Sequence, residues 1–262
     1  MDALSWILLS TVAAGALSVL IAGIFLLAPE RMRALALPHL VSFATGALLG
    51  AALLALLPEA VKQGGTDSVY GIGLALVAGI GIFFVLEKAV LWRHSHSGEY
   101  ADHGPHHDHH HHREQASATL VLIGDSMHNA LDGVLIAAAF LTDTQLGIVT
   151  AIAAVTHEIP QEIGDFAVLL NSGMSRARAL VLNLATSLTS VIGGVAAYFA
   201  LHQVQDILPY ALAVAAASFL YVAVADLIPG LHRKVDVRTS VMQVLLIAAG
   251  IGAIAWLEAS AH

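Results

Sequence analysis

Residues 117–141, SATLVLIGDSMHNALDGVLIAAAFL, and residues 146–170, LGIVTAIAAVTHEIPQEIGDFAVLL, place histidines and carboxylates inside two apolar runs. Each run is long enough to cross a bilayer, which takes roughly 20 apolar residues in a helix. A charged side chain at the centre of a membrane costs at least about 2.5–3.5 kcal/mol. Two successive spans with so many ionisable groups therefore predict a compensating partner, and a bound metal cation is the most economical one.

The overall composition is that of a membrane protein. The 262 residues are 58% hydrophobic and 11% charged, whereas soluble domains carry about 25% charged residues. The chain has no cysteine, which excludes disulfides and thiolate ligands. Imidazole, carboxylate and amide groups are then the candidate ligands, and they suit zinc, iron, manganese and similar ions. No basic patch indicates a nucleic-acid partner.

The sequence predicts an all-α polytopic membrane protein with one transmembrane domain, residues 1–262. Eight segments are long and apolar enough to be transmembrane helices. They lie at about 4–27, 36–57, 69–91, 117–141, 146–170, 178–201, 207–229 and 239–257. The first has no basic leading region, so we interpret it as a retained helix and not as a cleaved signal peptide.

The basic residues orient these spans. Ten of the eleven lysines and arginines lie at or beyond the ends of the odd-numbered spans, and only Lys62 falls on the other side. Cytoplasmic loops are enriched in Lys and Arg, so both termini are predicted to lie outside. The second and seventh spans each end at a proline, Pro58 and Pro229, after a run of small residues. Because these two ends would face opposite sides of the membrane, they indicate a 3+2+3 inverted repeat.

The connection at 94–114 differs from every other loop. Residues 94–112 contain nine of the fifteen histidines, mixed with Asp102 and Asp108. Such a tract predicts a flexible cytoplasmic segment that binds metal. The alternative is a polar linker that binds metal only in the test tube.

The polar residues of the fourth and fifth spans fall on two neighbouring helical stripes, because residues four apart share a face. One stripe holds His128, Asp132, His157 and Gln161, and the other holds Asn129, Glu158 and Glu162. Pro160 removes a backbone hydrogen bond beside these residues and predicts a kink. The alternative is that these groups only hydrogen-bond one another and hold the two helices together.

Three further acids of the spans have open roles. Asp125 and Asp165 lie about one turn from the centre and are either helix-end caps or residues of the permeation pathway. Asp226, close to the cytoplasmic end of the seventh span, is either a metal ligand or a partner of Arg233.

The motifs His128-Asn129-x-x-Asp132-Gly133 and His157-Glu158-x-Pro160-x-Glu162-x-Gly164-Asp165 resemble the fourth- and fifth-helix signatures of the ZIP zinc/iron permeases. They are most similar to the subgroup whose fifth helix carries His-Glu-x-Pro-His-Glu-x-Gly-Asp, and the resemblance covers essentially the whole chain.

The resemblance implies a paired metal site midway across the membrane. It assigns His128, Asp132, His157 and Gln161 to one ion, and Asn129, Glu158 and Glu162 to its neighbour. It also implies alternating-access transport of divalent metal towards the cytoplasm. Zn²⁺ is the main expected substrate, Cd²⁺, Fe²⁺ and Mn²⁺ are further candidates, and no organic cofactor is expected.

Two departures from the subgroup bear on selectivity. Gln161 stands where the subgroup has a second histidine, and Ala51 and Ala55 stand where its second helix has an Asp and a His. The site therefore has fewer nitrogen ligands, and the entrance carboxylate that the subgroup's second helix provides is missing. These departures predict a broader range of metal substrates or a lower affinity for zinc.

Two other classes of function compete with transport. His157-Glu158-x-x-Gln161 is one residue away from the His-Glu-x-x-His motif of zinc proteases, but the second histidine is missing, and we expect no enzyme activity. The other competitor is a metal sensor or buffer that binds through the 94–112 tract without transport. The expected partners are divalent metal ions and the lipids of a bacterial cytoplasmic (inner) membrane. A homodimer is a candidate form of assembly.

Overall fold

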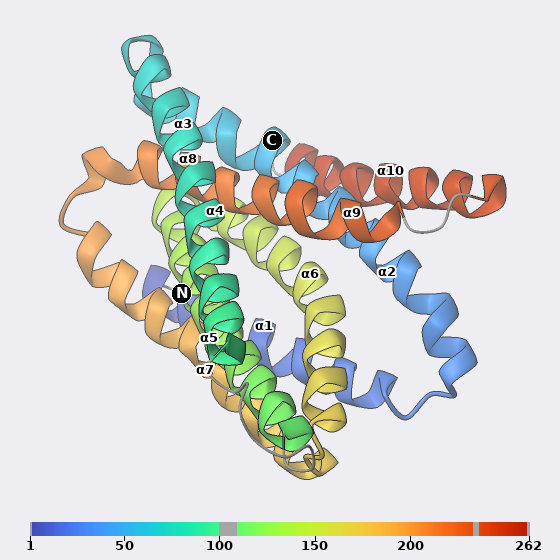
Figure 1. Ribbon diagram of the computed structural model, residues 1–262. Helices are drawn as coiled ribbons and strands as arrows, with labels where there is room; N and C mark the ends of the chain where they lie inside the picture. Colours follow the sequence, from blue (N-terminus) through green and yellow to red (C-terminus); the bar gives the residue numbers. More distant parts are fainter. Residues whose placement is uncertain (1, 100–108, 233–235, 261–262) are drawn as a thin grey trace.

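The computed structural model describes residues 2–99, 109–232 and 236–260, with the backbone alone at 89–99, 109–117 and 120. Every regular element among them is helical (Figure 1), which confirms the predicted all-α class. The elements are α1 Ala3–Phe25, α2 Glu30–Gly50, η1 Ala51–Leu56, α3 Leu57–Gly64, η2 Thr66–Ser68, α4 Val69–Glu99, α5 His109–Thr142, α6 Thr144–Asn171, α7 Arg176–Leu201, η3 Gln205–Ile207, α8 Leu208–Tyr221, η4 Val222–Leu227, α9 Ile228–Leu231 and α10 Val237–Ala259. Within the described ranges they form eight rods, because η1 joins α2 to α3 and η4 joins α8 to α9 without a break.

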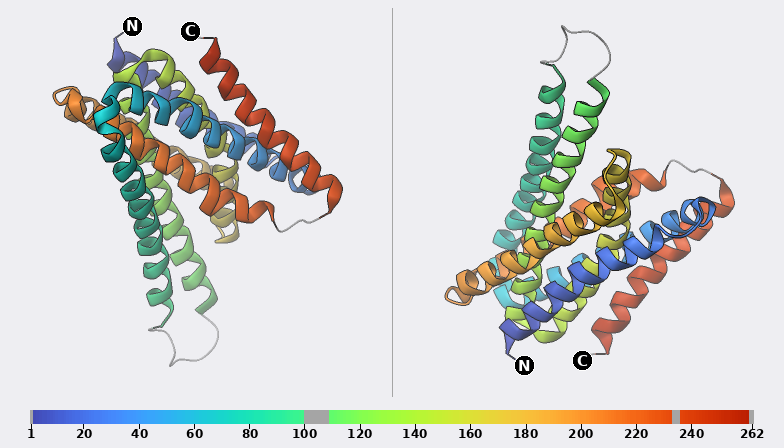
Figure 2. Two further views of the ribbon diagram at one scale, coloured as in Figure 1. Left: turned by 90° about the horizontal axis from the view of Figure 1, so that it is seen from above. Right: turned by 90° about the horizontal axis from the view of Figure 1, so that it is seen from below.

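The rods have the dimensions of membrane spans. Six of those described are long and apolar enough to cross a bilayer. The other two, α5 and α6, are 34 and 28 residues long and carry the acidic residues noted above. The chain is therefore an integral, multi-pass membrane protein. The start of α1 and the end of α10 lie at the same end of the bundle (Figure 2), whereas the side of the membrane on which the termini lie stays a prediction.

The prediction that Pro58 and Pro229 end their helices is wrong. Each proline follows a six-residue π-helical segment, η1 or η4, and the helix continues beyond it as α3 or α9. Just before the prolines, the N–H of Leu57 bonds to the Ala52 carbonyl and that of Ile228 to the Ala223 carbonyl. These bonds span five residues instead of four, and the wider turn admits a ring that would clash inside a regular α-helix.

The 94–114 tract is shorter as a loop than predicted. Residues 94–99 belong to α4 and residues 109–114 to α5, because a helix that has already formed extends by one hydrogen bond per added residue. The two helices run side by side (Figure 2). Residues 100–108, with the middle of the histidine tract, lie outside the described residues.

The helices pack as two sets of four. One set comprises α1, α5, α6 and α7, and the other comprises the rods of α2, α4, α8 and α10. Inside the first set α1 packs on α6, and α7 packs on α5 in the same way. Inside the second set α2 packs on α10, and α8 packs on α4. In a 3+2+3 inverted repeat, the first three rods, which begin with α1, α2 and α4, correspond to the last three, which begin with α7, α8 and α10, and α5 corresponds to α6. The matched contacts and the two π-helical segments are the pattern that such a repeat would give.

Glycines allow the closest contacts inside each set. A Cβ on Gly133 of α5 would lie 1.8 Å from the Ser190 carbonyl oxygen of α7, and a Cβ on Gly46 of α2 would lie 2.1 Å from the Ile247 carbonyl oxygen of α10. Small residues bring membrane helices together because apolar lipid leaves van der Waals packing as a main source of attraction. The two sets meet instead across a buried layer rich in alanine, which includes Ala51, Ala55 and Ala154.

Candidate metal centre

The polar side chains of α5 and α6 face each other in the interior. Asp143 separates the two helices and caps α6, because its carboxylate accepts the N–H groups of Gln145 and Leu146 at 2.8 and 3.1 Å. This single-residue connection folds α6 back onto α5. Figure 1 shows that α6 changes direction along its length, and Pro160 lies inside it.

Four residues bring their ligand atoms together. The group comprises His128, Asp132, His157 and Glu158, with one donor atom of each within 4.8 Å of every other. Nε2 of His157 lies 3.2 Å from Oδ2 of Asp132 and 3.0 Å from Nε2 of His128. Oε1 of Glu158 lies 3.6 Å from the His128 nitrogen. Zinc with bonds of about 2.0–2.2 Å holds tetrahedral ligand atoms about 3.3–3.6 Å apart, so the spacing fits one ion.

The hydrogen bonding of His157 directs a lone pair into this group. Its Nδ1 lies 3.1 Å from the Ala153 carbonyl oxygen, which can only accept a hydrogen bond. In the neutral ring Nδ1 is thus the protonated nitrogen, and Nε2 offers its lone pair to the group. The ring is 1% exposed and packs edge-on against Phe219 of α8, with ring centroids 5.9 Å apart. Nε2 and the Asp132 oxygen lie 3.2 Å apart, a contact that either a proton on Nε2 or a cation bound by both atoms stabilises.

A second group of acids adjoins the first. Oxygens of Asp125, Glu158 and Glu162 lie within 4.8 Å of one another, so Glu158 belongs to both groups. The three residues are at most 4% exposed. Both carboxylate oxygens of Glu158 are buried without a hydrogen-bond donor among the described residues, and the buried Glu162 carboxylate lies against the Asn183 amide of α7. An unsatisfied buried polar group costs about 1–3 kcal/mol, and more when charged, so these oxygens need a cation or protons.

The remaining candidate residues occupy different places. The Asn129 amide donates to Oδ1 of Asp125 at 2.8 Å and to the Asp125 carbonyl at 3.1 Å. Gln161 lines a cavity together with His128. The Asp165 carboxylate has one buried oxygen without a hydrogen-bond donor in the described part of the chain. Asp226 lies on the same cavity as Gln161, whereas Arg233, its alternative partner, lies outside the described residues.

The cavity has a volume of about 290 Å³ and opens beside the first group. Its wall includes Glu87 of α4 and Tyr221 of α8, and the tyrosine hydroxyl donates a hydrogen bond to the Glu87 carboxylate. The cavity therefore joins His128 and Gln161 to two further carboxylates, those of Glu87 and Asp226. Ala51 and Ala55 contribute to none of its walls and are instead 0% and 1% exposed in the apolar layer.

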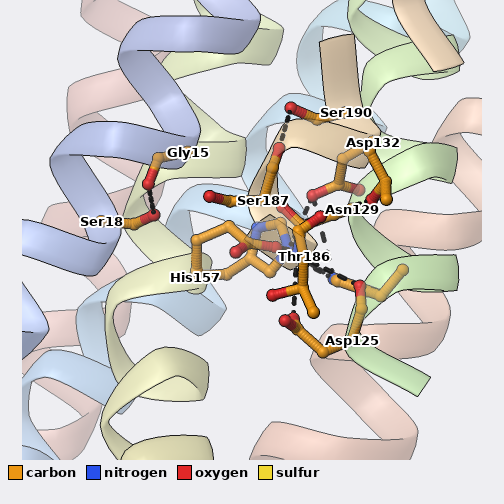
Figure 3. Close-up of polar contacts among 12 residues, drawn as sticks. Gly15, Ser18, Asp125, Asn129, Asp132, His157, Thr186, Ser187 and Ser190 are labelled. Atoms are coloured by element: carbon orange, nitrogen blue, oxygen red, sulfur yellow. Dashed lines mark hydrogen bonds and ion pairs between the residues drawn. The ribbon is translucent and has the colours of Figure 1, made fainter. Parts of the chain in front are cut away.

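Sequence reasoning missed a contribution from α7. Asn183, Thr186, Ser187 and Ser190 are buried on this helix. Figure 3 shows Thr186 pointing towards Asp125, close to Asn129 and Asp132. Their spacing of three, one and three residues is a polar helical stripe that could have been noticed in the sequence. Only packing shows that the stripe faces α5 and α6, because α7 contacts α5 more extensively than any other helix.

Comparisons with known proteins agree with the motifs. The model of the ZIP zinc transporter family matches residues 92–258. The chain is 34% identical over 230 residues to a protein of Pongo abelii named zinc transporter ZIP13, covering 82% of this chain and 65% of that one. It is 31% identical over 267 residues to the ZIP13 protein of Danio rerio, covering 85% and 76%. It is 39% identical over 150 residues to zinc transporter ZIP10 of Mus musculus, covering 55% and 18%.

The chain thus spans just under two thirds of the Pongo abelii relative and less than a fifth of the ZIP10 relative. The match to the family model takes in α5 and α6 with both polar motifs, and it continues into α10. The chain belongs to the ZIP zinc transporter family.

Proposed function

We propose that this protein transports divalent metal ions, chiefly Zn²⁺, across the membrane towards the cytoplasm. The observation that carries the proposal is the convergence of two imidazoles and two carboxylates within 4.8 Å between α5 and α6. Nitrogen and oxygen ligands without sulfur suit zinc and its first-row neighbours. The names of the relatives, zinc transporters ZIP13 and ZIP10, support zinc as the substrate.

His128, Asp132, His157 and Glu158 form the core of the proposed transport site. Gln161 adds an amide oxygen from the cavity side, and Glu162 and Asn129 extend the site on the other side. The burial of the Asp132, Glu158 and Glu162 carboxylates is a second support for the proposal. Ionised carboxylates in a membrane interior mark ion pathways when no basic partner neutralises them.

Alternating access is the proposed mechanism. An asymmetry in exposure supports this mechanism, because His128 is about 20% exposed beside the cavity while His157 is 1% exposed. The cavity lies between α4, α5, α6 and the rod formed by α8 and η4, towards the end at which α4 and α5 lead to residues 100–108. By the distribution of Lys and Arg, that end is cytoplasmic. The alanine-rich layer closes the site on the opposite side, where the two helix sets would have to separate to admit metal.

A proteoliposome experiment tests transport directly. Purified protein is reconstituted with a zinc-sensitive dye inside the vesicles, and the initial rate of fluorescence change after external Zn²⁺ is added measures uptake. We expect saturable uptake, and its loss in the His157→Ala variant reconstituted at equal amount. A protein that binds zinc but never carries it into the vesicles would instead be a sensor or buffer. Residence in a bacterial cytoplasmic membrane and assembly as a homodimer stay predictions.

A further inference from the structure

A hydrogen bond joins the two helix sets at the end of the bundle where both termini lie (Figure 2). Gln145, in the first turn of α6, donates through its side-chain amide to the Leu257 carbonyl of α10 at 2.9 Å. Leu257 lies in the last turn of α10, where carbonyls lack an intrahelical donor and accept from outside the helix. The backbone N–H of Gln145 is itself held by the Asp143 carboxylate at 2.8 Å. The bond therefore connects a fixed point of the first set to the second set.

Lys62 adds an electrostatic contact across the same boundary. It is the one basic residue that the sequence places on the outer side, and its ammonium lies 3.0 Å from the Glu59 carboxylate on the same helix, α3. The charges of Asp143, between α5 and α6, and of Glu258, on α10, also attract the ammonium. Because Asp143 belongs to the first set and α3 to the second, one of these attractions crosses the boundary. Attractions between exposed charges are weak and are screened by salt.

A cavity weakens the apolar packing at this part of the boundary. It has a volume of about 610 Å³, with Gln63 of α3 and Thr142 of α5 among the residues that line it. These two residues are the sequence neighbours of Lys62 and Asp143, so the cavity adjoins the charge contact. Side chains that face a cavity lack the packed neighbours from which dispersion attraction comes. The polar contacts therefore carry a larger share of the attraction between the sets here than in the alanine-rich layer.

We propose that Gln145 and Lys62 form an outer latch, which holds the helix sets together while the cavity beside His128 is open. The inference rests on the proposed alternating access, because metal enters from outside only if the sets part at this end. Parting breaks the bond of Gln145 to α10 and separates Lys62 from Asp143. Loss of one hydrogen bond shifts a two-state equilibrium by about fivefold, which changes the population of a minor state. The latch thus sets the balance between the access states, although neither residue is a candidate ligand.

Labelling of a single introduced cysteine tests the latch, because the chain has no cysteine of its own. Ala55→Cys places a thiol in the alanine-rich layer, where Ala55 is 1% exposed. A membrane-impermeant maleimide, added to membrane vesicles whose outer side faces the solution, reaches this thiol when the sets part. We expect Gln145→Leu to raise the labelling rate about fivefold. Gln203→Leu is the matched control and should leave the rate unchanged, because Gln203 is exposed between α7 and η3.

Ionic strength separates the contribution of Lys62. Salt should speed the labelling of Ala55→Cys, since it screens the attraction of the ammonium across the boundary, and this dependence should disappear in Lys62→Gln. Ser187→Cys reports unfolding, because Ser187 packs against Gly15 of α1 inside the first set and stays covered when the sets move as units. Faster labelling of Ser187→Cys as well as of Ala55→Cys in the Gln145→Leu background would mean general loosening, and it overturns the latch.

The latch and the proposed transport fail separately, because labelling requires no zinc. Equal labelling rates in Gln145→Leu and Gln203→Leu overturn the latch and leave zinc uptake by the wild-type protein untouched. A wild-type protein that takes up no zinc, although Gln145→Leu speeds labelling, overturns transport and supports the latch. No labelling of Ala55→Cys in any background also overturns the latch, since the sets would then not part at the outer end.

Discussion

At the scale of single residues, Gln161 is the departure from the ZIP subgroup motif that bears most on metal selectivity. The ZIP subgroup that the motifs resemble has histidine there, and Gln161 lies on the cavity beside His128. An amide oxygen is a weaker zinc ligand than a neutral imidazole. The histidine-containing group nevertheless keeps two imidazoles and two carboxylates, so the site can hold zinc without the missing nitrogen.

Changing Gln161 to His should tighten zinc binding. We expect the apparent KM for zinc uptake to fall by about tenfold, equivalent to about 1.4 kcal/mol. The maximal rate should stay equal or decrease, because an ion held more firmly leaves more slowly. Initial rates in proteoliposomes over a range of zinc concentrations measure both constants. An unchanged KM at matched protein levels would place Gln161 outside the coordination sphere.

Changing Asp132 to Ala should have the opposite effect. The variant removes the carboxylate whose oxygen lies 3.2 Å from Nε2 of His157. Losing this charged ligand should raise the apparent KM by more than about tenfold, the lower limit for loss of a supporting residue around a metal. Asp206→Ala, on the surface at η3, is the control. Equal kinetics in both variants would mean that Asp132 does not touch the ion.

At the scale of helices, close packing inside each set fixes the ligands. Gly133 directly follows Asp132 and sits where α5 meets the backbone of α7. A side chain there would push the two helices apart and move Asp132 with them. The position of the Asp132 carboxylate thus depends on Gly133, a residue that contributes no ligand atom itself.

Changing Gly133 to Ala should destabilise the protein. The added Cβ would lie 1.8 Å from the Ser190 carbonyl oxygen, which belongs to the backbone and cannot turn aside. Overpacking costs typically about 1–3 kcal/mol, so the thermal unfolding midpoint in detergent should fall. Gly252→Ala is the matched control, because a Cβ on Gly252 would meet nothing within 4 Å. Equal midpoints for the two variants would contradict the close contact of α5 with α7.

The helices show what a single sequence can and cannot give. The apolar runs predicted the long helices of the described residues, because length and hydropathy are local properties, and six of these helices are apolar enough to cross a bilayer. The continuation past Pro58 and Pro229 was missed, because π-helical turns that accommodate proline have no simple local signal. The stripes on α5 and α6 placed His128, Asp132 and His157 together, but they did not place Glu158 beside the histidines or Asp125 beside Glu162. The contribution of α7 depends on which neighbour this helix faces, and tertiary packing decides that.

At the scale of the whole molecule, one side of the site is open and the other is closed. The cavity opens from the site between α4, α5, α6 and the rod of α8 and η4, while the alanine-rich layer between the helix sets covers the opposite side. In the proposed alternating-access cycle, this asymmetry would be reversed. The small side chains between the sets make such a rearrangement compatible with the tight glycine contacts inside each set.

The histidine tract should act on the exit of metal and not on permeation. Deletion of residues 95–112 should leave uptake present while changing its regulation or apparent affinity. The described ends of this segment, 95–99 in α4 and 109–112 in α5, lie beyond the cavity-lining residues on the predicted cytoplasmic side. Uptake by the deletion variant is compared with that of the full chain at equal reconstitution. Complete loss of uptake in a variant that folds and inserts would make the tract part of the route.

The location of bound metal tests the central claim most directly. Crystals of the purified protein with Zn²⁺ or Cd²⁺ give an anomalous-scattering map that places the ion without reference to any assumed site. We predict a strong peak between α5 and α6, with the Nε2 atoms of both His128 and His157 within about 2.0–2.4 Å of it. Peaks confined to the 94–112 tract, with the space between α5 and α6 empty of metal, would contradict the account.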